Sequence, residues 1–77
     1  MAQILSPLPG TFYRSPSPDQ PSYKADGDAV LAGDVIGLIE VMKSFHEVKA
    51  ETAGSNIRYL VDNEEPVMAG APLADID

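Results

Sequence analysis

Residues 35–50 of this 77-residue chain read VIGLIEVMKSFHEVKA, and this stretch decides between two folds. Most of it belongs to residues 38–53, a segment without glycine or proline that is rich in Glu, Lys, Met and Ala and that spaces four apolar side chains as a helix would. Elsewhere Gly, Pro, Asp or Asn interrupts the chain every few residues, which favours short strands and turns. Local periodicity therefore permits a helix here, whereas the surrounding sequence favours an all-β domain.

An internal repeat surrounds this stretch. Residues 30–40 align without gaps with residues 67–77, at a constant offset of 37 positions, and four of the eleven aligned pairs are identical. A repeated unit that cannot bury its own apolar face alone is stabilised by packing on its twin. We therefore expect one closed domain made of two related halves, with chance similarity among small apolar residues as the alternative.

The repeat continues upstream with one interruption. Residues 26–28 align with residues 63–65, and residues 10–14 align with residues 54–58. The first half spans 12 positions between these blocks (26 − 14) and the second spans 5 (63 − 58), so the first half carries seven extra residues. They fall within residues 15–22, which we predict to form an insertion.

The repeat favours strands for the central stretch. The segment that repeats residues 36–40 follows a proline and is too short for a stable helix. We therefore predict a β-hairpin with strands Val35–Val41 and Ser44–Ala50, turning at Met42 and Lys43.

This hairpin has an unfavourable turn at Met42 and Lys43. Two-residue hairpin turns need positive φ angles and favour Asn-Gly, Asp-Gly or Gly-X, which these residues do not supply. A local rule broken at an exposed tip is typical of functional sites, although most surface lysines are simply solvated charges. Lys43 also lies almost midway between the two repeated segments, so we predict that it is an attachment site for a mobile group.

Composition limits the functions open to the chain. Twelve acidic against five basic residues give a formal charge of −7, which disfavours nucleic acid and anionic membranes and favours basic partner surfaces. The length suffices for one small core but not for a deep active site. The chain has no cysteine, no signal sequence and no apolar run long enough to span a bilayer, so we expect a cytoplasmic location.

Two motifs resemble the biotinyl domains of biotin-dependent carboxylases. Glu40-Val41-Met42-Lys43 is similar to the Glu-Ala-Met-Lys-Met sequence of that family. Residues 6–19, SPLPGTFYRSPSPD, resemble the biotin carboxyl carrier protein of bacterial acetyl-CoA carboxylase, and the similarity extends from about residue 4 to residue 77.

The resemblance implies a fold and a function. The implied fold is all-β: a flattened barrel or sandwich of two four-stranded antiparallel sheets with pseudo-two-fold symmetry, forming a single biotinyl domain over residues 1–77. A protruding thumb within residues 15–22 would lie close to biotin. In the family, biotin is joined to a lysine by an amide, and its ureido nitrogen receives a carboxyl group at one active site and yields it at another. The implied process is fatty acid biosynthesis.

The resemblance also assigns roles to residues. Lys43 is the biotin attachment residue, and Glu40 and Met42 belong to the region that a biotin protein ligase recognises. We also expect Ser44, next to the lysine, among the biotin-binding residues. The expected partners are that ligase, a biotin carboxylase subunit and a carboxyltransferase subunit; catalysis would lie with them and not with this chain. The thumb residues are Ser15, Pro16, Ser17, Pro18 and Asp19.

Two departures from the family leave questions open. Ser44 stands where the family usually has a second methionine, and Val41 replaces the common alanine, so a dedicated ligase remains an option. About three residues precede the domain, whereas full-length carriers of this kind have an N-terminal region that helps bind biotin carboxylase. The chain is thus expected to be either an excised domain or a stand-alone carrier, and its carboxyl acceptor and oligomeric state stay open.

Two other functions compete with this interpretation. A lipoyl-type carrier would share the fold but would favour Asp-Lys-Ala at the tip and would lack the thumb. An unmodified acidic interaction module would leave the lysine inert.

His46 has no Ser, Cys or second His at a motif spacing, so we expect a surface strand residue there and neither a catalytic dyad nor a metal site.

Overall fold

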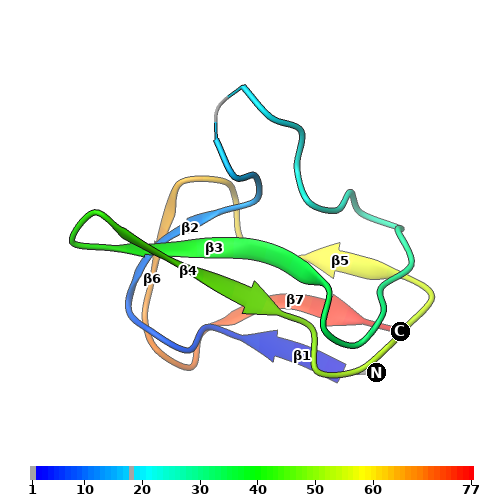
Figure 1. Cartoon of the computed structure of the whole chain (residues 1–77). Coiled ribbons are helices and arrows are strands. Elements are labelled where there is room, and N and C mark those ends of the chain that lie inside the picture. Colours follow the sequence, from blue (N-terminus) through cyan, green and yellow to red (C-terminus); the bar gives the residue numbers. More distant parts are fainter. Residues whose placement is uncertain (1, 18) are drawn as a thin grey trace.

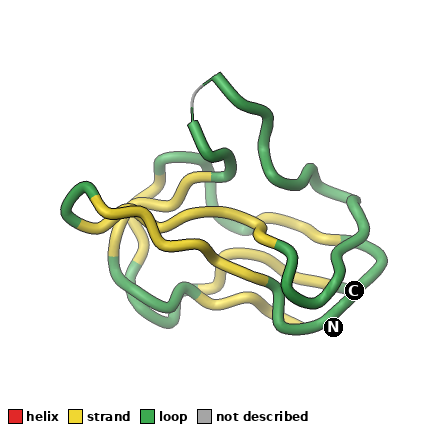
Figure 2. Tube along the Cα trace, viewed as in Figure 1, coloured by secondary structure: helices red, strands yellow, loops and turns green. Residues whose placement is uncertain are grey.

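The structure of the chain, a computed structural model, describes residues 2–17 and 19–77. These residues contain seven strands and no helix, as Figure 2 shows by colour. No membrane-spanning helix exists in this part of the chain. The strands are β1 Ala2–Leu5, β2 Gly10–Tyr13, β3 Val35–Val41, β4 Ser44–Lys49, β5 Ile57–Tyr59, β6 Glu65–Val67 and β7 Pro72–Ile76.

The strands form two antiparallel sheets that lie against each other in a flattened body (Figure 1). One sheet has the strand order β1-β7-β5 and the other has the order β4-β3-β2-β6. The body measures 33 × 27 × 19 Å, so its thickness is little more than half its length. The predicted all-β architecture of two antiparallel sheets is confirmed.

The first sheet has three regular strands, and residues 27–30 run along its open edge at β5. Val30 and Gly54 exchange both backbone hydrogen bonds, at 2.9 and 2.8 Å. The Gly27 N–H donates to the Ile57 carbonyl at 2.7 Å, and the Ile57 N–H donates to the Asp28 carbonyl at 2.9 Å. This segment occupies the position of the expected fourth strand, although its ladder is too irregular to count as one.

The two sheets repeat each other in strand order. Adding residues 27–30 to the first sheet gives β1-β7-β5-(27–30), which matches β4-β3-β2-β6 position by position. The pairing of Gly10 with Val67 in one sheet has its counterpart in the pairing of Gly54 with Val30 in the other. The two halves are therefore related by pseudo-two-fold symmetry.

The hydrogen bonds correct one detail of the sequence alignment. The Glu64 N–H donates to the Phe12 carbonyl, as the Gly27 N–H does to Ile57, so Phe12 corresponds to Ile57. The alignment had paired Phe12 with Asn56, one position earlier. The physical reason is burial, because Phe12 and Ile57 are both fully buried. The first half is then longer by eight residues (27 − 12 = 15 against 64 − 57 = 7), which equals the length of residues 15–22.

The core lies between the sheets and draws on both halves. Successive residues of a strand face opposite sides of its sheet, so paired Phe12 and Ile39 share the inner face. Gly37 lets this packing occur, because a Cβ there would lie 2.5 Å from the Phe12 ring. The largest fully buried side chains are Phe12, Val30, Ile36, Ile39, Ile57 and Leu73.

The predicted hairpin is confirmed by β3 and β4, with β4 ending one residue earlier than predicted. Strand β3 pairs with β2 on one edge and with β4 on the other. The four apolar side chains at helical spacing do not share an environment, because Leu38 is buried whereas Met42 and Phe45 are exposed. Pairing on both edges of β3 therefore outweighs the local helical pattern.

Candidate attachment site at the β3–β4 hairpin

The tip of the β3–β4 hairpin is a two-residue turn at Met42 and Lys43. Val41 pairs with Ser44, and the two residues between them have φ angles of 49° and 68°. Positive φ at both central residues is the geometry of a type I′ turn, which matches the right-handed twist of the flanking strands. For side chains other than glycine or asparagine this conformation costs about 1 kcal/mol or more per residue. The predicted backbone strain at the lysine is present.

The hairpin tip extends beyond the rest of the sheet (Figure 1). Strand β2 pairs with β3 no further than Glu40, so residues 41–44 pair only with each other. Met42 is 93% exposed, and Lys43 and Ser44 are exposed as well. Neither ion pair found in the described residues involves Lys43. The side chain of Lys43 is therefore accessible from the solvent.

Glu40 and Phe45 face each other across the hairpin on its outer side. The Tyr13 hydroxyl donates a long hydrogen bond to Glu40 Oε1 at 3.5 Å, and the rings of Tyr13 and Phe45 are 6.1 Å apart between centroids. Partial burial first, and then the carboxylates of Glu40 and Glu64, raise the pKa of Tyr13. The base of the hairpin is thus tied to β2, while its tip stays clear.

A cavity of about 290 Å³ connects the hairpin with the predicted insertion. Phe45, two residues after Lys43, forms one wall together with Tyr13 and Glu64. Three of the predicted thumb residues form another wall, whereas Asp19 is exposed and does not line the cavity, and Pro18 lies outside the described residues. Those three are Ser15, Pro16 and Ser17.

Sequence reasoning missed three residues of this cavity: Tyr13, Phe45 and Glu64. The signal for Phe45 was present, because a hairpin turning at residues 42–43 pairs it with Glu40 and puts both on one face. Tyr13 stood in the motif of residues 6–19 but had been given no role. Glu64 had no comparable signal, since it arrives from the other half of the chain.

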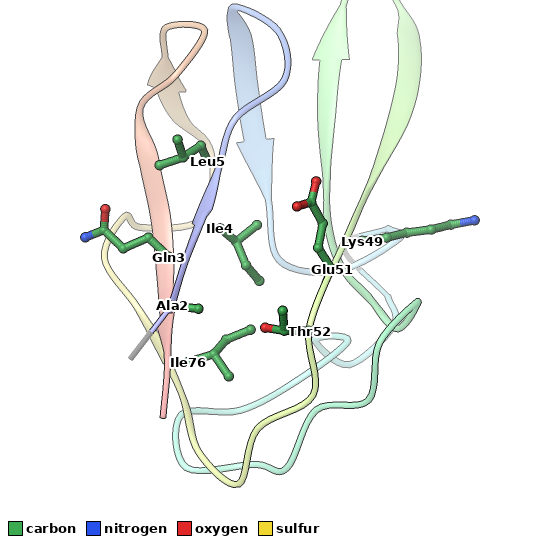
Figure 3. A pocket seen from close by; sticks show the side chains of 8 residues that line it. All are labelled: Ala2, Gln3, Ile4, Leu5, Lys49, Glu51, Thr52 and Ile76. Atoms are coloured by element: carbon green, nitrogen blue, oxygen red, sulfur yellow. The ribbon is translucent and has the colours of Figure 1, made fainter.

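A second cavity, of about 240 Å³, lies between the free edges of the two sheets (Figure 3). It is bounded by β1 on one side and by residues 49–52 on the other. Lys49 pairs with Val35, at the end of the hairpin away from the turn. This cavity contains none of the predicted site residues and is remote from Lys43.

His46 and the acidic turn between β5 and β6 lie apart from the lysine. His46 is exposed on β4, opposite Ile39. The Asp62 N–H donates to Glu65 Oε1 at 2.9 Å, so this acidic side chain caps its own turn. Within residues 2–17 and 19–77, no group of three or more His, Cys, Asp or Glu residues could hold a metal ion.

Comparison with known proteins identifies the class to which this fold and hairpin belong. The profile of the biotin/lipoyl family, described as "Biotin-requiring enzyme", matches residues 2–76. The chain belongs to this family, which confirms the resemblance inferred from the two motifs.

Curated relatives narrow the class further. The chain is 40% identical over 76 residues to the biotin carboxyl carrier protein of acetyl-CoA carboxylase from Nostoc sp., covering 99% of this chain and 42% of the relative. It is 44% identical over 70 residues to the protein of the same name from Chlamydia pneumoniae (91% and 42%). A chloroplastic form from Arabidopsis thaliana is 41% identical over 70 residues (91% and 28%). The chain thus spans less than half the length of these relatives.

Proposed function

We propose that this chain is a biotin carboxyl carrier in which biotin is attached to Lys43. The observation that carries the proposal is an exposed lysine held in a strained two-residue turn, in a chain of a family described as biotin-requiring. The sequence of the turn, with Met42 before the lysine and Glu40 three residues before it, supports the same assignment. In this proposal residues 1–77 form one biotinyl domain.

The chemistry of lysine suits a mobile carrier. Its side chain and an attached acyl group together reach roughly 12 Å from the backbone, judged from ordinary bond lengths. Amide formation removes the ammonium charge, so the arm can enter a partner's active site without the cost of burying a cation. A hairpin tip beyond the edge of β2 gives the arm clearance. The barrel serves as a rigid support, and catalysis belongs to the partner subunits.

The remaining site residues have proposed roles of two kinds. Met42 and Ser44, which are exposed beside the lysine, and Glu40, which is held against Tyr13, form the surface that a biotin protein ligase recognises. Residues 15–22, named here the thumb segment, lie close to the attached biotin. The shared cavity between Phe45 and three thumb residues supports this second role.

The proposed partners follow from the names of the relatives. Biotin on Lys43 would receive a carboxyl group at a biotin carboxylase subunit and yield it at a carboxyltransferase subunit of an acetyl-CoA carboxylase-type complex. The formal charge of −7 favours partner surfaces with basic patches.

Intact-mass spectrometry after co-expression with a biotin protein ligase tests the proposal. We expect one biotin adduct on the unaltered chain, none on Lys43→Arg, and an unchanged far-UV spectrum, because the turn contributes little to the core. The matched control is Lys49→Arg, an exposed lysine on the same hairpin, which should keep the adduct. An adduct retained by Lys43→Arg would overturn the assignment, a lipoyl mass would favour the lipoyl-type carrier, and no adduct would favour an unmodified module.

A further inference from the structure

Arg14 lies where the two ends of the thumb segment meet. It follows β2 directly, and its carbonyl accepts a hydrogen bond from the Tyr23 N–H at 2.8 Å. Its own N–H donates to Asn63 Oδ1 at 2.7 Å, in the second half of the chain. The main chain of Arg14 thus closes the base of the thumb segment and ties it to the opposite half.

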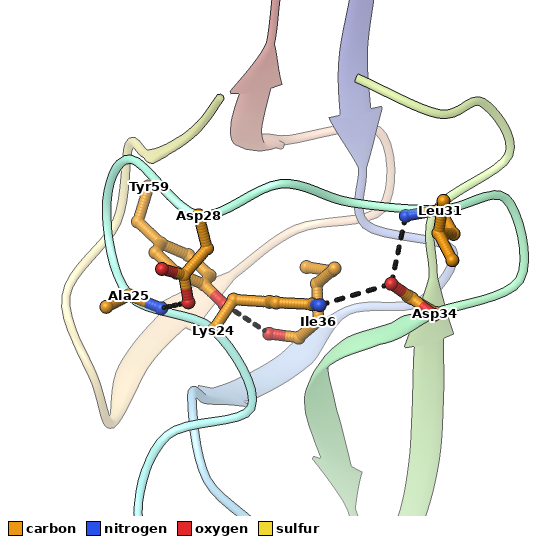
Figure 4. A network of polar contacts seen from close by, with 7 residues as sticks. All are labelled: Lys24, Ala25, Asp28, Leu31, Asp34, Ile36 and Tyr59. Carbon is orange, nitrogen blue, oxygen red and sulfur yellow. Dashed lines mark hydrogen bonds and ion pairs between the residues drawn. The ribbon is translucent and has the colours of Figure 1, made fainter. Parts of the chain in front are cut away.

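The side chain of Arg14 strengthens this connection. Its guanidinium carbon lies 4.6 Å from the centroid of the Tyr59 ring, and its Nη2 donates to the Val61 carbonyl at 2.6 Å. The Tyr59 hydroxyl donates in turn to the Ile36 carbonyl at 2.7 Å, which fixes the ring against β3 (Figure 4). Arg14 therefore rests on a platform that both halves hold in place.

A second contact secures the chain just beyond the thumb segment. Lys24 forms an ion pair with Asp34 at 3.1 Å (Figure 4). The pKa of Asp34 is held below its usual value, mainly by the hydrogen bond from the Leu31 N–H and next by the hydrogen bond from Lys24. Lys24 and Asp34 both belong to the connection between β2 and β3. Arg14, by contrast, joins the thumb segment to the other half of the chain.

Arg14 is held by stacking and hydrogen bonds and not by an ion pair. Its Nε is buried without a hydrogen-bond partner, which costs free energy. Arg14 takes part in neither ion pair of the described residues, so its charge is not there to neutralise a carboxylate. Arg58, the other arginine of the sequence, is exposed on β5 and provides a natural comparison.

We propose that Arg14 is a positioning residue, which holds the thumb segment in one place relative to the Lys43 hairpin. Three thumb residues, Ser15, Pro16 and Ser17, follow Arg14 directly and line the same cavity as Phe45. The orientation of Arg14 therefore sets the position of these residues relative to Phe45. The planar guanidinium can stack on a ring and donate to a carbonyl together, and the lysine ammonium cannot reproduce both. The role in carboxyl transfer rests on the proposed function, whereas the mechanical role does not.

The mechanical role is tested by ¹⁵N relaxation on the full chain. We compare Arg14→Lys and Arg14→Met with the matched controls Arg58→Lys and Arg58→Met. In both Arg14 variants the order parameters of the thumb-segment amides should fall from about 0.85 to below about 0.6, while those of the seven strands stay unchanged. The Arg58 variants should match the unaltered chain. A thumb segment that stays rigid in both Arg14 variants would overturn the proposal.

Arg14→Lys also separates positioning from general stability. If Arg14→Met unfolds the barrel, the milder lysine variant decides. Loss of order in strands and thumb segment alike in Arg14→Lys would mean that the residue is merely structural, and the proposal would be wrong.

The role in the carrier reaction is tested with the biotinylated chain as substrate of a biotin carboxylase, with ATP and bicarbonate. If the biotin carboxylase binds only chains whose thumb segment is in place, KM rises by the inverse of the fraction of chains in that state. A fall of this fraction to a third raises KM about threefold, and kcat stays unchanged. Arg58 variants should keep the original KM. A mobile thumb segment with an unchanged KM would overturn this role. Absence of a biotin adduct on Lys43 would instead count against the proposed function, and the relaxation data would still decide the mechanical role.

Discussion

The two halves of the barrel solve the same packing problem with different residues. In the first half, the Gly33 N–H donates to Ala50 and the Ala50 N–H donates to Asp34, each at 2.8 Å. In the second half, Gly70, Ser6 and Ala71 make the same pair of hydrogen bonds, also at 2.8 Å. Gly33 and Gly70 have φ angles of 91° and 83°. Sequence identity between the halves is modest, yet the backbone geometry is repeated, because both halves must close the same edges over one core.

Two differences between the halves belong to the candidate site. The β3–β4 hairpin ends in the Met42–Lys43 turn, whereas at the equivalent place of the other sheet β7 and β1 pair at Ile76 and Ala2 without being joined, as Figure 1 shows. The thumb segment has no counterpart at all between β5 and β6. The backbone features that the halves share are required for packing, whereas the hairpin turn and the thumb segment occur once each and are the features for which we propose a function.

The largest expected effect tests the equivalence of the halves in the core. Ile36 and Leu73 are related by the 37-residue offset and are both fully buried. Ile36→Ala and Leu73→Ala should each lower the free energy of unfolding by about 2–5 kcal/mol, from lost burial and a cavity. Urea denaturation followed by circular dichroism measures both. If only one of the two substitutions lowered the free energy of unfolding, the two core positions would not be equivalent.

The next largest effect on stability is expected at Tyr59, whose hydroxyl connects the halves by donating to the Ile36 carbonyl. Burial raises the pKa of Tyr59 to about 12, against the opposing effect of the Arg14 cation. The neutral phenol is favoured in the folded state, so its contribution to stability is complete below pH 10 and is lost as pH rises from about 10 to about 12.

Tyr59→Phe removes the hydrogen bond to Ile36 and should cost about 1 kcal/mol at neutral pH. It should also flatten the loss of stability between about pH 10 and pH 12. Thermal unfolding across that range measures both effects, with Tyr23→Phe, which lies outside the core, as the control. An equally steep alkaline decline in Tyr59→Phe would contradict the assignment.

A smaller effect is expected where the halves use different residues in one turn. Gly27 and Glu64 are equivalent by the 37-residue offset and have φ angles of 96° and 65°. Glu64→Gly relieves the strain of a side chain in the left-handed region but adds backbone freedom to the unfolded chain, so it should stabilise by less than about 1 kcal/mol. Thermal denaturation would reveal the change, and a lower melting temperature would argue against strain at Glu64.

The smallest effect on stability is expected from removing the thumb segment. Deleting residues 15–22 would join Arg14 to Tyr23, whose N–H already lies 2.8 Å from the Arg14 carbonyl oxygen. The connection from β2 to residues 27–30 would then equal in length the connection from β5 to β6. The shorter loop changes the free energy of loop closure by less than about 1 kcal/mol. Cooperative unfolding should persist. A broad, non-cooperative transition would show that the segment supports the barrel.

Much of this arrangement could be predicted from the residues. The repeat at a 37-residue offset indicated two packed halves, and the turn at Met42 and Lys43 indicated positive φ angles before any backbone was seen. The sequence alignment missed the equivalence of Phe12 and Ile57. With these two residues aligned, the neighbouring pairs contain no identical residues, so only burial and hydrogen bonding reveal the equivalence. Arg14 stood in a recognised motif, but its partners Tyr59, Val61 and Asn63 are 45 or more positions away, and no local pattern connects them.

The sequence by itself determined the all-β class, the doubled core and the lysine at the hairpin tip, because frequent turn residues and a repeat at a 37-residue offset outweighed the helical spacing of the central stretch. Only the tertiary structure decided which side chains surround that hairpin. Tyr13, Phe45 and Glu64 share a cavity with the thumb segment, and Arg14 stacks on Tyr59, because pairing of distant strands brings these residues together. Such contacts depend on strand register, and register is settled by which side chains the whole fold can bury.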